Sequence, residues 1–189
     1  MLLYRVFPYL ASATAGEPGH PTYLHRPQGR GRLDNPSEYD CWYLSEQEAG
    51  AVAEIFADLL RWTDDMFAAP YLPGATRALG TYEIADDTAL LDLDDARNLL
   101  SRGLRPTQVI ERNRPATQAW ALDIYNERQG GTAARLWAGV RWWSYHRPQW
   151  RVMGIWGVTP TSVRVDTLAL THPAVMDAAR VLAKPLPAT

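Results

Sequence analysis

The sequence has few cysteines, lysines and histidines and no long apolar run. Cys41 is the only cysteine, which excludes an intramolecular disulfide and a cysteine-rich zinc module. The four histidines are scattered, so we expect no metal site. No apolar stretch has the roughly 20 residues of a membrane-spanning helix. Arg5 and Pro8 interrupt the first apolar stretch, which is not typical of a signal peptide. We therefore expect a cytoplasmic protein with no membrane partner.

Lysine is almost absent as a source of positive charge, because Lys184 is the single lysine among 19 basic residues. The formal net charge is −2, which speaks against nucleic acid as a direct partner. The charge is nevertheless uneven: residues 34–95 form a strongly acidic segment and residues 96–164 a strongly basic segment. Either the two segments are solvated faces that attract each other, or the basic segment forms a wall that faces an anionic ligand. The opposite charges also permit self-association into a homo-oligomer.

The 189 residues are enough for one domain with its own hydrophobic core. Helix and strand patterns are mixed without βαβ regularity, which predicts the α+β class. Pro115 predicts a helix break or a new helix start within one long helical pattern. The predicted strands are 2–7, 41–44, 78–84, 88–93, 135–143, 151–157 and 162–166. The predicted helices are 45–60, 94–101, 106–128 and 172–183, and residues 11–38 are a predicted loop rich in Gly and Pro.

The helix predicted over residues 45–60 has the clearest pattern. Ser45 and Glu48 fit a capping box, in which each side chain accepts a backbone N–H of the first turn. Apolar residues recur at helical spacing as far as Leu59 and Leu60. Glu54 lies well off this apolar stripe, so we expect its side chain to face away from the core.

Familiar motifs of nucleotide binding and nucleophilic catalysis are missing. There is no P-loop, no complete dinucleotide fingerprint, no nucleophile elbow and no His-Glu-x-x-His. Instead, Arg32 lies in the segment GRLDNP, Tyr43 in WYL and Glu54 in AE, and the three follow one another at equal intervals. Much later the strand pattern GVRWW ends on Ser144, and Arg5 lies in the first predicted strand.

This arrangement resembles the RES domain family, which is named after its Arg, Glu and Ser, and the resemblance covers residues 3–157. Where the family has Gly-Gly-Arg-Trp-Asn, this chain has RGRLDN, and Ser144 is followed by YHR rather than directly by arginine. The resemblance implies a single domain over residues 1–189 with a fold like that of ADP-ribosyltransferases. In that fold small β-sheets and flanking helices form a cleft for NAD. We expect the strands at 2–7 and 41–44 to border the cleft.

The resemblance also implies an activity. Known members of the family degrade NAD by phosphorolysis or hydrolysis, or transfer ADP-ribose to a protein, and many are toxins controlled by an antitoxin. It therefore implies an enzyme that uses NAD as its substrate, with no metal, and takes inorganic phosphate, water or a protein as acceptor. It further implies an antitoxin partner with a helix-turn-helix domain. Two alternatives stay open: a catalytically silent binding module on the same fold, and a nucleic-acid-binding protein that uses the basic segment.

The chemistry of NAD cleavage suggests a role for each of these residues. An oxocarbenium-like ribose needs a nearby carboxylate, for which Glu54 is the candidate. A pyrophosphate needs guanidinium forks, which Arg5 and Arg32 can supply. Tyr43 can stack on the nicotinamide ring, and Ser144 can bind the carboxamide or orient the catalytic carboxylate. The structural alternatives are a solvated helix residue, an ion-paired or surface arginine, a core tyrosine and a strand-end serine.

Overall fold

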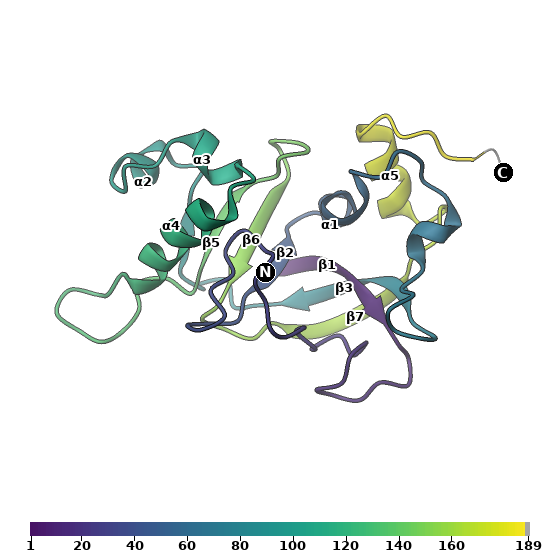
Figure 1. The fold of residues 1–189 in the computed structure, drawn as a ribbon, viewed down its shortest axis with the longest axis horizontal. Coiled ribbons are helices and arrows are strands. Elements are labelled where there is room, and N and C mark those ends of the chain that lie inside the picture. Colours follow the sequence, from purple (N-terminus) through teal and green to yellow (C-terminus); the bar gives the residue numbers. More distant parts are fainter. Residues whose placement is uncertain (188–189) are drawn as a thin grey trace.

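A single seven-stranded sheet forms the centre of the fold (Figure 1). The computed structural model describes residues 1–187. The strand order is β4-β5-β6-β2-β1-β3-β7. Only the pair β4–β5 is parallel among the neighbours. The strands are β1 (Leu2–Tyr9), β2 (Trp42–Ser45), β3 (Thr76–Glu83), β4 (Leu90–Asp92), β5 (Gly139–Trp143), β6 (Arg151–Ile155) and β7 (Thr161–Thr167). Together with the helices this confirms the α+β class.

The helices cover the sheet in two groups (Figure 1). One group lies beside β5 and β6, where Trp120 and Ile124 share a hydrophobic cluster with Val140 and Val152. The other group lies near β1 and β3 and shares a second cluster with them. The first group is α2 (Ala96–Leu100), α3 (Pro106–Ile110) and α4 (Arg114–Asn126); the second is α1 (Glu48–Phe56) and α5 (Pro173–Val181), with a 3-10 turn η1 (Asp64–Phe67).

The sheet is nearly divided between β1 and β2. These strands meet at one register pair, Tyr4 with Ser45. By contrast, β1 pairs with β3 along its whole length, and β2 pairs with β6 through all of its residues. The small sheets expected from the resemblance are therefore joined into one sheet that is almost separated in its middle. The strands at the division are the two that were predicted to border a cleft.

The capping box predicted at Ser45 is wrong, and α1 begins later than predicted. Ser45 is the last residue of β2, where it pairs with Val152 of β6. Its hydroxyl donates to the Arg151 carbonyl (3.1 Å) and accepts the Gln47 N–H (3.2 Å). Gln47 takes the N-cap position, without a side-chain cap. The strand pairing therefore outweighs the local helical signal at Ser45.

The C-terminal end of this helix also differs from the prediction. The helix ends at Phe56, and Leu59 and Leu60 are 40% and 91% exposed, so they do not continue its buried face. Trp62, only 1% exposed, folds back instead and donates its indole N–H to the Phe56 carbonyl (3.0 Å). A tertiary contact thus replaces the last predicted turns of the helix.

The pattern over residues 106–128 divides before Pro115, which confirms the second of the two predicted alternatives, a new helix start. Residues 106–110 form α3, and α4 begins at Arg114 with Pro115 in its first turn. Asn113 caps α4 by accepting the Ala116 N–H (3.4 Å). Within residues 1–187, no helix combines the length and the apolar character needed to cross a membrane. The same residues contain no group of three or more His, Cys, Asp or Glu side chains placed to hold a metal ion.

Candidate active site

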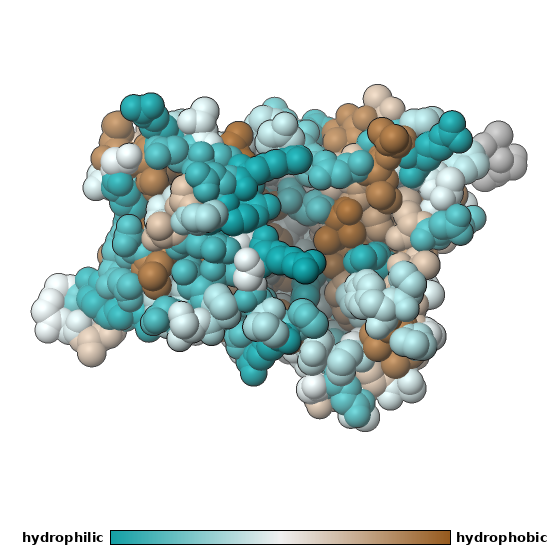
Figure 2. All heavy atoms as spheres, in the orientation of Figure 1, coloured by the Kyte–Doolittle hydropathy of each residue, from teal (hydrophilic) through white to brown (hydrophobic). Residues whose placement is uncertain are grey.

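A cavity of about 840 Å³ opens where β1 and β2 separate. This volume lies in the range of roughly 300–1,000 Å³ that is typical of small-molecule sites. Figure 2 shows the hollow near the middle of the face, between hydrophilic and hydrophobic side chains. Arg5, Arg32, Tyr43 and Glu54 line the cavity, whereas Ser144 is not one of the lining residues. The fold therefore brings together residues that are far apart in the sequence.

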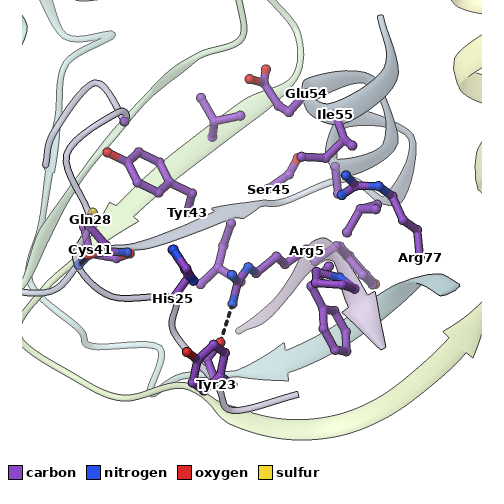
Figure 3. Close-up of a pocket in the computed structure, with 18 of the residues that line it drawn as sticks. Arg5, Tyr23, His25, Gln28, Cys41, Tyr43, Ser45, Glu54, Ile55 and Arg77 are labelled. Atoms are coloured by element: carbon purple, nitrogen blue, oxygen red, sulfur yellow. Dashed lines mark hydrogen bonds between the residues drawn. The ribbon is translucent and has the colours of Figure 1, made fainter. Parts of the chain in front are cut away.

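Glu54 projects from α1 toward the cavity (Figure 3). The opposite face of the helix is buried, so the side chain points away from the core as the sequence predicts. Ser144 is 1% exposed and donates its hydroxyl to Glu54 Oε1 at 2.5 Å. The serine is fixed in turn, because its hydroxyl accepts the His146 N–H (3.1 Å) and its own N–H donates to the Trp150 carbonyl (2.8 Å). Of the two roles considered for Ser144, this geometry corresponds to orientation of the carboxylate.

The Tyr43 hydroxyl forms two hydrogen bonds with the loop that carries Arg32. Its hydroxyl donates to Asp34 Oδ1 (2.6 Å) and accepts the Leu33 N–H (2.8 Å). The second oxygen of Asp34 accepts the Gly31 N–H (2.7 Å). Burial raises the pKa of Tyr43, which favours the protonated hydroxyl that donates to Asp34. The sequence indicated Tyr43 but gave no signal for the role of Asp34.

Glycine is required at position 31 of this loop. A Cβ there would overlap the Tyr43 hydroxyl and lie 2.5 Å from Asp34 Oδ1. Gly29, two residues earlier, has open space around the same position. The glycine that precedes Arg32 therefore allows the loop to approach β2 closely. This contact fixes the position of the Arg32 backbone.

Arg32 reaches the cavity with a fixed guanidinium. Its Nη1 donates to the carbonyls of Val109 (2.7 Å) and Glu111 (2.6 Å) at the end of α3. No carboxylate in the described part of the chain forms an ion pair with it. Burial lowers the pKa of Arg32, as does the nearby charge of Arg114, whereas Glu54 acts in the opposite direction. The group thus stays available to an anionic ligand.

Arg5 is also free of a carboxylate partner among residues 1–187. Its Nη1 donates to the Tyr23 carbonyl at 3.4 Å (Figure 3), and its guanidinium lies 5.2 Å from the centre of the Trp42 ring. Burial lowers its pKa. The structural ion pair considered as the alternative for Arg5 is therefore not formed with these residues.

Four further basic side chains line the cavity without any motif to indicate them. They are His20, His25, Arg77 and Arg114. His25 lies in the long loop before β2 and Arg77 in β3, and Figure 3 shows both beside the cavity. Arg114 is the first residue of α4. Only the packing of the loop, β3 and α4 around one cavity brings them to the site.

Several ion pairs join the acidic segment to the basic segment. Arg141 of the basic segment pairs with Asp92 of the acidic segment, and Arg151 pairs with Asp94. Arg114 is the one residue of the basic segment whose charge lies on the cavity wall described here. The geometry thus corresponds to two faces that attract each other, and the arginines of the cavity come mainly from outside the basic segment.

The fold and the cleft define a class: an α+β protein whose divided sheet opens into a cavity with several arginines and one oriented glutamate. The family model of the RES domain matches residues 2–182, and the chain belongs to this family. The resemblance predicted from the sequence is confirmed, and the match extends beyond residue 157 to include α5.

One solved structure gives a comparison of the fold. A chain of the crystal structure of the M. tuberculosis MbcT-MbcA toxin-antitoxin complex is similar, with a TM-score of 0.54 and 14% sequence identity. The similarity covers 97% of this chain and 89% of that chain. At this identity it shows a shared fold. No curated protein sequence matches the chain.

Proposed function

We propose that this protein is an NAD-degrading enzyme that cleaves the bond between nicotinamide and ribose, by phosphorolysis or hydrolysis. One observation carries the proposal: the Glu54 carboxylate, oriented by Ser144 at 2.5 Å, borders a cavity that also holds Arg5 and Arg32 without carboxylate partners. A single negative charge opposite several unpaired guanidiniums suits a substrate with an anionic part and a reacting centre that becomes positive.

The proposed reaction breaks the bond between ribose C1′ and the nicotinamide nitrogen. The electron pair of that bond leaves with nicotinamide, and C1′ becomes oxocarbenium-like. The Glu54 carboxylate stabilises this positive charge and holds the ribose hydroxyls. An oxygen of inorganic phosphate or of water then forms the new bond to C1′; when water attacks, its proton passes to the solvent.

In the proposed reaction, Arg5, Arg32 and Tyr43 bind NAD. Arg5 and Arg32 bind the pyrophosphate, because a guanidinium can donate two parallel hydrogen bonds to phosphate oxygens. The ring of Tyr43 stacks on nicotinamide. Since the Tyr43 hydroxyl is tied to Asp34 and Leu33, the ring cannot rotate away from the cavity, and this supports a positioning role.

We further propose that the protein is the toxin of a toxin–antitoxin pair and acts in the cytoplasm. Membership of the RES family supports this role, and so does the shared fold with a chain of a toxin–antitoxin complex. The antitoxin, expected to carry a helix-turn-helix domain, would cover the cavity. Expression of the protein alone should then stop growth, and co-expression with the product of an adjacent gene should restore it.

The deciding experiment incubates the purified protein with NAD, with and without inorganic phosphate, and measures nicotinamide by chromatography. Release of nicotinamide is expected. ADP-ribose 1-phosphate among the products identifies phosphorolysis, and free ADP-ribose identifies hydrolysis. Label from adenylate-labelled NAD on an added protein instead identifies ADP-ribosyl transfer. Absence of nicotinamide release under all these conditions would refute the proposal in favour of a silent binding module.

A further inference from the structure

Arg114 is the most unusual charged residue of the cavity wall. Its Nε donates to the Arg30 carbonyl (3.1 Å), but its Nη1 is buried and has no hydrogen-bond partner in the described structure. Arg114 also lies close enough to Arg32 for its charge to lower the pKa of that residue. The cavity wall thus contains two neighbouring guanidiniums, and neither forms an ion pair with a carboxylate of residues 1–187.

Such an arrangement is unfavourable in an empty protein. A buried donor of a charged group without a partner costs more than a hydrogen bond contributes, and two like charges repel each other. An anion bound beside the two guanidiniums offsets their mutual repulsion. Both groups are already fixed by backbone carbonyls, Arg32 by Val109 and Glu111 and Arg114 by Arg30. Binding an anion would therefore require little reordering of side chains.

We propose that Arg114 binds a phosphate group in the cavity, together with Arg32. Phosphate fits because several oxygens can accept from two guanidinium forks at once. The inference rests on the proposed function for the source of that phosphate: it is either the pyrophosphate of NAD or the inorganic phosphate that attacks the ribose. The two sources would make the same contacts with Arg114. They differ in which probe loses affinity when Arg114 is replaced: ADP-ribose for the pyrophosphate, inorganic phosphate for the attacking phosphate.

The test is calorimetric titration of the full-length protein with inorganic phosphate and, separately, with ADP-ribose. Arg114→Gln should weaken the binding of one of the two about tenfold or more. The one affected identifies the source. Arg114→Lys, which keeps the charge but not the fork, should weaken the same titration by a smaller factor. It serves as the second variant should Arg114→Gln fail to fold.

Gln118→Ala is the matched control for a merely structural role. Like Arg114, Gln118 holds the arginine loop, because its Nε2 donates to the carbonyls of Gly29 (3.2 Å) and Gly31 (3.0 Å). It carries no charge, so its removal should leave both affinities within about twofold. An equal loss in Gln118→Ala, unchanged affinities in the Arg114 variants, or no binding of either probe to the wild type would overturn the inference.

The titrations separate this inference from the proposed function. A wild type that binds phosphate or ADP-ribose through Arg114 but releases no nicotinamide refutes only the proposed cleavage of NAD. A wild type that cleaves NAD while Arg114→Gln binds both probes as before refutes only the role of Arg114.

Discussion

Replacing Glu54 by Gln removes one negative charge from the cavity and changes little else. The amide has nearly the same size and can still accept a hydrogen bond from Ser144, which now lies 2.5 Å from the carboxylate. Glu54 is an exposed residue of α1 and forms no ion pair within residues 1–187, so the change from a charged to a neutral acceptor for Ser144 should lower the free energy of unfolding by about 1 kcal/mol at most. The variant therefore tests the charge rather than the fold.

The expected loss of activity follows from the position of the charge. Glu54 is exposed, so an effective dielectric constant of about 20 is appropriate rather than a lower value. For a separation of about 5 Å from the positive C1′ of the proposed reaction, a unit charge then contributes about 3 kcal/mol. Removing it should slow nicotinamide release about a hundredfold. Because the charge develops in the transition state, kcat should fall while KM for NAD changes little.

The assay follows nicotinamide release at saturating NAD, with circular dichroism to establish that the variant is folded. Glu48→Gln is the matched control, because Glu48 lies on the same helix but not on the cavity wall. It should keep the activity of the wild type. A folded Glu54→Gln variant with near-wild-type kcat would refute the electrostatic role of Glu54.

Three further substitutions test the supports of the site and the fold. Ser144→Ala should lower kcat about tenfold without raising KM for NAD, since it removes a hydrogen bond to a charged group; a rise in KM alone would contradict this positioning role. Gly31→Ala should destabilise the protein by about 1–3 kcal/mol in urea unfolding, whereas Gly29→Ala should be close to neutral; equal effects would contradict the close approach of the loop. Trp62→Ala should cost about 3–5 kcal/mol in the same experiment, and Leu60→Ala less than about 0.5 kcal/mol, because the first side chain is buried and the second exposed.

Local patterns in the sequence predict where most elements lie but not where they end. The helix break at Pro115 could be predicted because proline restricts its own backbone. The ends of α1 could not be predicted, because Ser45 is drawn into β2 by pairing with β6, and Trp62 reaches back to Phe56. Both contacts depend on tertiary packing, which outweighs helix propensity.

The residues of the candidate site likewise include some that the sequence predicts and some that it does not. Arg32 and Glu54 could be singled out because they belong to one family motif in a short stretch of sequence. Arg77 and Arg114 carry no motif, and they reach the cavity only through the packing of β3 and α4 around it. Asp34 lies inside the motif, but its hydrogen bond to Tyr43 depends on the loop folding back onto β2. A sequence pattern cannot predict the roles of such residues, because these roles depend on contacts between distant parts of the chain.

The division of the sheet explains why the cavity and the carboxylate coincide. α1 follows β2 almost directly, so it begins beside Ser45, where β1 and β2 form their single register pair before they separate. Gly50 lets this helix pack closely, since a Cβ there would lie 2.5 Å from Ser45 Oγ and 3.4 Å from Trp150. The close packing brings Glu54, one turn later, within reach of Ser144 at the end of β5. Ser45 therefore packs against α1 rather than capping it. The short link between β2 and α1 holds the Glu54 carboxylate beside the cavity.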